Sequence, residues 1–238
     1  MTWELRPARD HGLVPNDRLR SHQRERGLGS LAVALGWRQA VRAYLAAMHR
    51  LVVTGRENLP PPPFVMIGNH TSHLDALTLA AALPWPVARR AFALAAGDTF
   101  FGSAPAAAFA AYAVNALPIW RQRTTASDLA GLRARLIEDG AVYLLFPEGT
   151  RSRTGVLGPF KPGIGALVAG TDVPVVPCYL TGAGAAWPPN HTLPRPGRLR
   201  LQIGPPLDFS AIEPTREGGV LVAETCRAAV QAMAAGPG

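Results

Sequence analysis

The amino-acid sequence predicts an α/β fold: a single domain with a largely parallel β-sheet flanked by helices, preceded by an N-terminal amphipathic helical segment. Three observations support this prediction. From residue 64 onward, short apolar runs suited to buried strands alternate with stretches of helical periodicity. The chain has 238 residues, of which 48% are hydrophobic, enough for one full core. It contains no evident internal repeat, which makes one α/β domain with a largely parallel sheet the economical architecture. Residues 1–51 are assigned to the N-terminal segment and residues 52–238 to the domain.

The N-terminal segment combines positive charge with helical periodicity. An arginine-rich stretch, residues 18–26, precedes residues 28–51, in which leucine, valine and methionine recur at helical spacing beside several basic residues. The helix is therefore either interfacial at a membrane or packed on the domain by one face, with its arginines in water. A run of four prolines at residues 60–63 then interrupts the chain ahead of the main alternation.

The elements of the domain follow in order. Apolar runs predict strands at residues 64–67, 91–96, 142–146 and 173–180, and an alternating run predicts a half-exposed edge strand at 198–203. Helical patterns predict helices at 74–83, at 129–139 after a capping box at 125–128, and at 217–233. Residues 99–120 carry no formal charge, but their prolines, glycine and many alanines favour a buried helix followed by a strand over a membrane span.

The composition narrows the possible partners and the compartment. The formal net charge of +8 favours polyanionic surfaces or ligands, but no basic stripe is interleaved with stacking aromatics, so no nucleic-acid partner is expected. Cys178 and Cys226 have neither metal nor redox spacing and are predicted to be buried or inert thiols in a reducing compartment. The polar, arginine-rich start of the chain lacks a signal-peptide pattern, so secretion is not expected.

The most informative residues are His70 and Asp75. His70 follows directly on an apolar strand, where its imidazole can take a proton from a substrate hydroxyl. A carboxylate one turn into the next helix can reach the other ring nitrogen and fix the tautomer. The pair therefore predicts a general base.

A second polar loop, residues 146–152 (Phe-Pro-Glu-Gly-Thr-Arg-Ser), follows another predicted strand. In α/β sheets ligands bind outside the carboxyl ends of strands, so the two loops are expected to face one crevice. Glycine permits close backbone approach, a threonine hydroxyl donates a hydrogen bond, and a guanidinium binds phosphate bidentately.

With these motifs the chain resembles the glycerolipid acyltransferases, in particular the 1-acyl-glycerol-3-phosphate (lysophosphatidic acid) acyltransferase type. Residues 69–75 (Asn-His-Thr-Ser-His-Leu-Asp) fit the first motif of the family, Asn-His-x-Ser-x-x-Asp, and residues 146–152 fit the third. Residues 160–163 resemble the segment that follows the third motif, and residues 173–177 resemble the fourth. The similarity runs from about residue 30 to about residue 210.

The resemblance implies an O-acyltransferase. His70 would deprotonate a lysophospholipid hydroxyl, first of all that of 1-acyl-glycerol-3-phosphate, with Asp75 orienting the imidazole. The alkoxide would attack an acyl thioester, from acyl-CoA or acyl carrier protein, without a covalent acyl-enzyme and without a cofactor, giving phosphatidic acid. The chain has no Gly-x-Ser-x-Gly elbow, which agrees with this route. Other acceptors stay open, namely glycerol-3-phosphate, a glycan or an amino-lipid.

The resemblance also implies the substrate-binding residues. They are Asn69, Ser72, Arg121, Glu148, Gly149, Thr150, Arg151 and Lys161. Glu148 either hydrogen-bonds free groups of the acceptor or braces its loop, and His73 is either structural or lines the entrance. The second motif departs from the family because the usual glycine is missing before Arg121, the phosphate candidate, for which Arg123 is the alternative. Aromatic residues could line an acyl tunnel or simply pack in the core: Phe100, Phe101, Phe109 and Trp120.

Two other classes of function are weighed. A binuclear metal hydrolase would need further histidines where Thr71 and Ala76 stand, so no metal is expected. A non-catalytic membrane-binding domain would need only the basic N-terminal segment and an apolar surface. For the acyltransferase, lipid substrates imply a peripheral position at an anionic membrane surface, on the cytoplasmic face of a bacterial plasma membrane.

Overall fold

The computed structural model describes residues 28–96, 117–119, 125–188, 191 and 193–235. In this part of the chain seven strands form one sheet in the order β1-β7-β6-β2-β5-β3-β4. The strands are β1 (Val52–Thr54), β2 (Phe64–Gly68), β3 (Ala91–Ala96), β4 (Leu117–Ile119), β5 (Val142–Leu145), β6 (Val175–Thr181) and β7 (Arg200–Ile203). Neighbouring strands are parallel except β6 with β7. The predicted α/β fold with a largely parallel sheet is confirmed.

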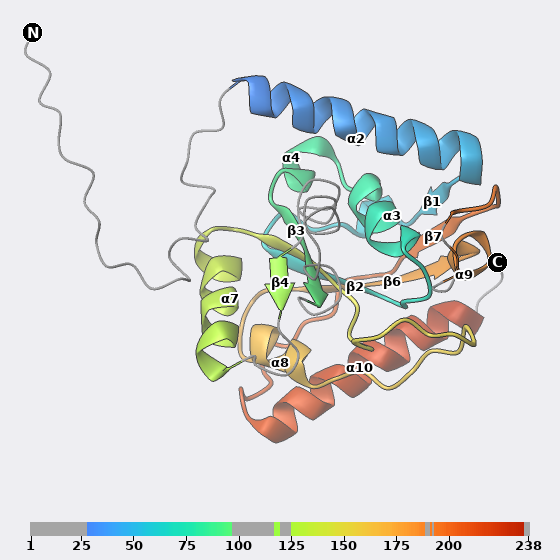
Figure 1. Ribbon diagram of the computed structural model, residues 1–238. Helices are drawn as coiled ribbons and strands as arrows, with labels where there is room; N and C mark the ends of the chain where they lie inside the picture. The colour runs from blue at the N-terminus through green and yellow to red at the C-terminus, as the bar shows by residue number, and fades with distance from the viewer. Residues whose placement is uncertain (1–27, 97–116, 120–124, 189–190, 192, 236–238) are drawn as a thin grey trace, which may run out of the picture.

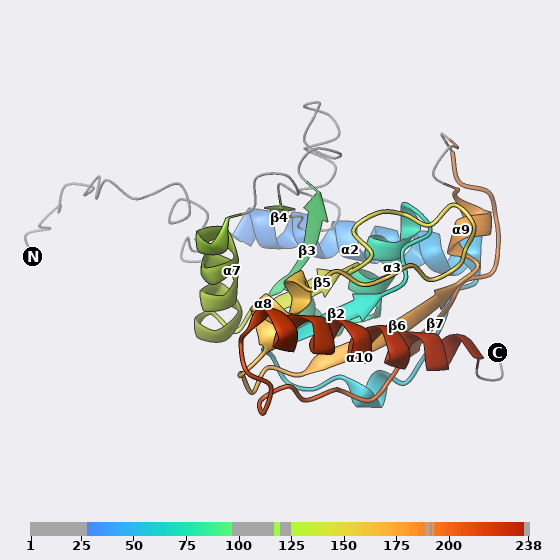
Figure 2. The ribbon, with the colours of Figure 1, turned by 90° about the horizontal axis from the view of Figure 1, so that it is seen from below.

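Helices cover both faces of the sheet (Figures 1 and 2). One face carries α2 (Leu28–His49), α3 (Leu74–Ala82) and α4 (Trp85–Ala88), and the other carries α7 (Ala126–Glu138), α8 (Gly163–Val168) and α10 (Arg216–Ala235). A 3₁₀ turn, η2 (Arg56–Asn58), follows β1, and α9 (Ala183–Ala186) follows β6. The capping box of α7 is confirmed, since Thr125 and Asp128 exchange side-chain and backbone hydrogen bonds.

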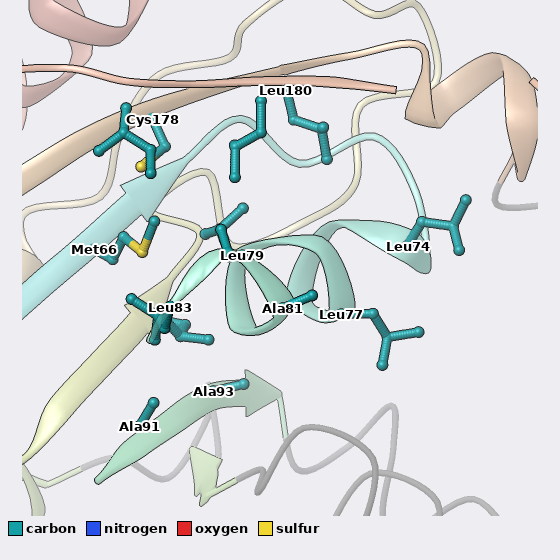
Figure 3. Close-up of a cluster of buried hydrophobic side chains, with 14 of the residues drawn as sticks. Met66, Leu74, Leu77, Leu79, Ala81, Leu83, Ala91, Ala93, Cys178 and Leu180 are labelled. Atoms are coloured by element: carbon teal, nitrogen blue, oxygen red, sulfur yellow. The ribbon is translucent and has the colours of Figure 1, made fainter. Parts of the chain in front are cut away.

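The central strand β2 shows why its sequence is a continuous apolar run. Phe64 and Met66 pack with α3 on one face, whereas Val65 and Ile67 pack with α8 and α10 on the other. Side chains of a strand alternate between faces, so a strand covered on both sides has no polar positions. Figure 3 shows the first of these clusters, with residues from β2, β3, β6 and α3.

The prediction of an edge strand at residues 198–203 is wrong in one respect. Leu201 and Ile203 are buried, whereas Arg200 is exposed and Gln202 half-buried, as the alternation predicted, but β7 lies inside the sheet between β6 and β1. The edge is β1, which the sequence did not reveal because it has three residues only. The sheet thus begins before the proline run at residues 60–63.

Helix α2 packs on the domain by one face. Leu45 and His49 are buried, and the guanidinium of Arg38 donates to the carbonyls of Ala80 and Leu83 at the end of α3. A helix packed on the domain is expected from its sequence to keep its arginines in water. Arg38 differs from this expectation because it hydrogen-bonds to the protein. Apolar side chains nevertheless remain exposed on α2, among them Val33 (67%) and Met48 (38%). Among the described residues, no helix is long and apolar enough to cross a membrane.

Candidate active site

The two polar loops meet at one edge of the sheet, as predicted. Strands β2 and β5 are adjacent and parallel, so their carboxyl ends deliver residues 69–75 and 146–152 to the same place. After β2 the chain continues to β3, which lies beyond β5 in the sheet, whereas after β5 it continues to β6, which lies beyond β2 in the opposite direction. The helices on these two connections, α3 and α8, lie on opposite faces of the sheet. This reversal of strand order is where open α/β sheets form their binding crevices. The backbone N–H of Ser152 donates to the carbonyl of His70 at 2.7 Å and joins the two loops.

His70 and Asp75 form the predicted pair. The Nδ1 of His70 lies 2.8 Å from Oδ2 of Asp75, and this oxygen also accepts the backbone N–H groups of Thr71 and Ser72. Asp75 is fully buried, whereas the His70 side chain is 18% exposed. A carboxylate fixed by two backbone donors can hold Nδ1 as the protonated nitrogen, which leaves Nε2 as the basic one. Among the described residues, Nε2 has no hydrogen-bond partner.

The ring of His70 is also held from its face. It stacks on Phe146 with ring centroids 4.3 Å apart and an interplanar angle of 16°. Phe146 is the residue that follows β5, so the second loop fixes the plane of the imidazole as well as its backbone. The stacking leaves the ring edge that carries Nε2 as its reactive side.

Glu148 braces the site. Its Oε1 accepts the backbone N–H of His70 at 2.8 Å, and its Oε2 accepts the N–H of Gly158 at 2.9 Å. The carboxylate is 8% exposed, so both oxygens serve the protein. Of the two roles considered for Glu148, this geometry favours bracing over contact with the acceptor. Arg227 of α10 extends the brace by donating to the carbonyl of Gly158 at 3.1 Å.

The substrate-binding role expected for Asn69 and Ser72 needs correction. The amide of Asn69 donates to the carbonyl of Leu180 and accepts its N–H, so the side chain pairs with β6 as a peptide unit would. The hydroxyl of Ser72 donates to the carbonyl of Trp187 and accepts the N–H of Leu74. Both side chains are buried, so they hold the loop that carries His70 and do not present polar groups to a ligand.

Gly149 leaves room for a cation at the site. Its φ of 72° lies in the left-handed region, which glycine adopts without strain. A Cβ at this position would lie 2.7 Å from Nζ of Lys161, so the lysine ammonium rests against the bare α-carbon of Gly149. The backbone N–H of Lys161 donates to the carbonyl of Pro147 at 2.9 Å. Lys161 and the neighbouring Thr150 are exposed, which suits them to an anionic ligand.

Arg151 lies deeper. Its Nη1 is 3.0 Å from Nδ1 and 2.5 Å from Nε2 of His73, and the His73 ring lies 5.0 Å from the ring of Trp187. Burial lowers the pKa of Arg151, and the nearby carboxylate of Asp75 counteracts that shift. His73 therefore contacts a candidate ligand residue, a role that no local pattern around it indicated.

Several candidates lie outside the described residues: Arg121, Arg123, Phe100, Phe101, Phe109 and Trp120. The strand expected near residue 120 is present as β4. Phe146, Gly158 and Arg227 were missed as site residues because each acts through a contact distant in sequence.

The chemistry of the described site is that of a base. Both cysteines are buried and free, as predicted, and burial raises the pKa of Cys226 to about 12 and also raises that of Cys178, so neither is a ready nucleophile. Within the described ranges, no group of three or more His, Cys, Asp or Glu side chains could hold a metal ion. The site instead offers a proton acceptor at Nε2 of His70, with the cations of Arg151 and Lys161 on the adjoining loop.

Comparison with known proteins identifies the family. Residues 50–181 match the Acyltransferase family. The chain is 33% identical over 159 residues to the chloroplastic 1-acyl-sn-glycerol-3-phosphate acyltransferase BAT2 of Brassica napus. The aligned residues make up 65% of this chain and 44% of that protein. It is 32% identical over 197 residues to a 1-acyl-sn-glycerol-3-phosphate acyltransferase of Chlamydomonas reinhardtii, which covers 81% of this chain and 54% of the relative. The chain thus spans about half the length of these two relatives.

A solved structure agrees in fold. The crystal structure of the 1-acyl-sn-glycerophosphate (LPA) acyltransferase PlsC from Thermotoga maritima superposes with a TM-score of 0.66 at 26% identity, over 93% of this chain and 88% of that one. On the match to residues 50–181 and on this likeness, the chain belongs to the acyltransferase family.

Proposed function

We propose that this protein transfers a fatty acyl group from an acyl thioester to the free hydroxyl of 1-acyl-glycerol-3-phosphate, giving phosphatidic acid. The observation that carries the proposal is the His70 imidazole, fixed by Asp75 at 2.8 Å and stacked on Phe146 at the start of the loop that carries Arg151 and Lys161. A base beside cations suits an acceptor that has both a hydroxyl and a phosphate. The names of the relatives support the same acceptor.

The proposed reaction has one proton acceptor. Nε2 of His70 takes the hydroxyl proton as the hydroxyl oxygen bonds to the thioester carbonyl carbon. The carbon–sulfur bond then breaks, and the imidazolium returns its proton to the leaving thiolate. Asp75, already bonded to Nδ1, stabilises the imidazolium in between. Such a base contributes ~10²–10⁴-fold in rate. The donor is acyl-CoA or acyl carrier protein, and no cofactor takes part.

We place the acceptor phosphate against the loop of residues 149–151 and Lys161. The left-handed Gly149 lets the Lys161 ammonium lie against the loop backbone, the Thr150 hydroxyl can donate, and a guanidinium can bind two phosphate oxygens. Arg121, outside the described residues, is a further phosphate candidate.

The membrane position is also a proposal: the protein lies peripherally on the cytoplasmic face of a bacterial plasma membrane. Its lipid substrates partition into the bilayer, so the site must dock to collect them. The exposed Val33 and Met48 of α2, together with the basic residues 18–26, supply an apolar and an electrostatic handle. High salt should release at least part of the protein from anionic vesicles, whereas salt-resistant and carbonate-resistant binding would argue for an inserted segment.

The decisive experiment is an assay of the purified protein with acyl-CoA or acyl carrier protein. Lysophosphatidate, glycerol-3-phosphate, and non-phosphorylated alcohols or amines are offered as acceptors, with and without a chelator. Turnover of lysophosphatidate that survives the chelator is expected. Turnover of a glycan or amino-lipid alone would overturn the acceptor assignment, and vesicle binding with no acyl transfer would revive the non-catalytic alternative.

A further inference from the structure

His73 and Arg151 form a pair at the edge of the proposed phosphate site. Nη1 of Arg151 lies 2.5 Å from Nε2 and 3.0 Å from Nδ1 of His73. The two residues are 78 positions apart in sequence, and each adjoins the catalytic machinery: His73 is the N-cap of α3, which carries Asp75, and Arg151 follows Thr150 in the phosphate loop. The contact therefore joins the two motifs through their side chains.

The chemistry of the pair constrains which partner donates the hydrogen bond. A guanidinium carries hydrogen-bond donors only, so in this contact Arg151 donates and one ring nitrogen of His73 accepts. Trp187 also contacts His73, with ring centroids 5.0 Å apart at an angle of 44°. The imidazole thus contacts both an aromatic ring and a guanidinium.

Within the described part of the chain, this arrangement leaves the binding edge of Arg151 without a protein hydrogen-bond partner. Both contacts to His73 use Nη1, and among the described residues Nε and Nη2 make no hydrogen bond. These two nitrogens form one of the edges with which an arginine binds two phosphate oxygens. Asp75 supplies the negative charge that counteracts the effect of burial on the Arg151 pKa.

We propose that His73 is a positioning residue that aims Arg151 at the phosphomonoester of the acceptor and so contributes to acceptor specificity. The inference rests on the proposed function and deepens it. Without the imidazole, the guanidinium would lose its fixed orientation, so it would lose more conformational entropy when the phosphate binds. The expected consequence is weaker acceptor binding with little change in the chemical step.

The test separates the acceptor lone pair from the aromatic packing. His73→Phe keeps a ring against Trp187 but cannot accept from Arg151, whereas His73→Gln keeps an acceptor oxygen. We expect His73→Phe to raise the KM for lysophosphatidate about tenfold, which is ~1.4 kcal/mol, with kcat and the donor KM changed less than about twofold. His73→Gln should restore most of the loss. His191→Gln is the matched control, since His191 also meets an arginine, Arg195, at 3.1 Å.

A double variant tests the route. In an Arg151→Ala background, which itself raises the acceptor KM, His73→Phe should add nothing further. Equal KM values for His73→Phe and the wild type, or additive effects with Arg151→Ala, would overturn the inference. So would a loss that appears equally with a phosphate-free acceptor. If His73→Phe does not fold, His73→Leu takes its place, because it also removes the acceptor nitrogen.

Failure of the proposed function has a different signature. If the wild type does not turn over lysophosphatidate, that function is wrong, and His73 is then judged by calorimetric binding of glycerol-3-phosphate. Binding weakened by His73→Phe and by Arg151→Ala, but not by His73→Gln or His191→Gln, supports the positioning role. Equal binding by all five proteins contradicts it.

Discussion

The carboxylate of Glu148 accepts the backbone N–H of His70 at 2.8 Å, so the loop after β5 holds the residue that follows β2. Its second oxygen accepts the N–H of Gly158, so one buried side chain fixes two loops. Hydrogen bonds to a charged group contribute ~1.5–3 kcal/mol each. Loss of this carboxylate would therefore act on the geometry of the base.

Glu148→Gln tests that role. An amide can accept from one of the two N–H groups but turns its NH₂ toward the other, so the His70 loop should shift. We expect kcat to fall about tenfold or more, a barrier increase of at least ~1.4 kcal/mol, with the acceptor KM nearly unchanged. Glu138→Gln on the exposed side of α7 is the matched control. A raised acceptor KM at constant kcat would instead make Glu148 a substrate ligand.

A cycle of His70→Ala, Asp75→Asn and the double variant tests the catalytic pair. Oδ2 of Asp75 serves both His70 and the backbone of its own loop, so base and orienter act as one unit. His70→Ala should lower kcat by ~10²–10⁴-fold, and the double variant should be little worse than this single one. Circular dichroism should show a retained fold. Losses that multiply would mean that Asp75 does not act through His70.

The sequence predicted most of the fold and the contact between His70 and Asp75 because both depend on residues that lie close together in the chain. Strands β2, β5 and β6 are buried on both faces, which leaves continuous apolar runs, and His70 and Asp75 lie within one turn of each other along the chain. Parallel neighbours β2 and β5 then had to bring their following loops together. Spacing and burial were sufficient for these features.

The remaining features depend on distant partners. Asn69 pairs with the backbone of Leu180, 111 residues away, and Arg227 meets Gly158 across 69 residues, so no local pattern distinguishes them from ligand residues or surface cations. Strand β1 is too short to show a period, and only its pairing with β7 makes that strand interior. The alternation in β7 predicted the burial of its side chains correctly, but it carried no information on which strands lie beside β7.

Arg38 should stabilise the docking of α2. Its guanidinium donates to the Ala80 and Leu83 carbonyls, two groups at the end of α3. Arg38→Ala should lower the free energy of unfolding by ~1–3 kcal/mol because two half-buried carbonyls lose a charged donor. Arg42→Ala removes an exposed cation one turn further along the same helix, near enough for its charge to act on Arg38, and should change the free energy of unfolding by less than ~0.5 kcal/mol in urea denaturation. Equal effects would show that the cation matters only through net charge.

His49 should make stability depend on pH. It is fully buried against the hydroxyl of Tyr44 at 3.0 Å, and burial lowers its pKa below the ordinary 6.5. Well above pH 6.5 the group is neutral in both the folded and the unfolded state and contributes no pH dependence. As the pH falls toward and below that value, His49 binds a proton in the unfolded chain but not yet in the folded protein, so the free energy of unfolding falls.

The slope from this one residue cannot exceed ~1.4 kcal/mol per pH unit, and it ends where the folded protein also takes up the proton. Urea denaturation between about pH 5.5 and pH 8 should show it in the wild type and not in His49→Gln, which keeps an acceptor for Tyr44. Parallel curves for the two proteins would mean that His49 is not the group that titrates.

Alanine substitutions at two glycines in the loop after β5 can distinguish the effect of backbone strain from the effect of displacing a cation. Gly149 and Gly155 both have positive φ, 72° and 78°, so alanine at either position costs ~1–2 kcal/mol of stability. Only at Gly149 does the new methyl meet a side chain, the ammonium of Lys161, whereas nothing lies within 4 Å of a Cβ at Gly155. The end of a lysine is flexible, so Lys161 would move aside and leave the phosphate loop. Gly149→Ala should therefore raise the KM for lysophosphatidate about as much as Lys161→Ala does, while Gly155→Ala should leave that KM unchanged despite a similar loss of Tm. If both alanine variants raise the KM equally, the loop backbone and not the lysine governs acceptor binding.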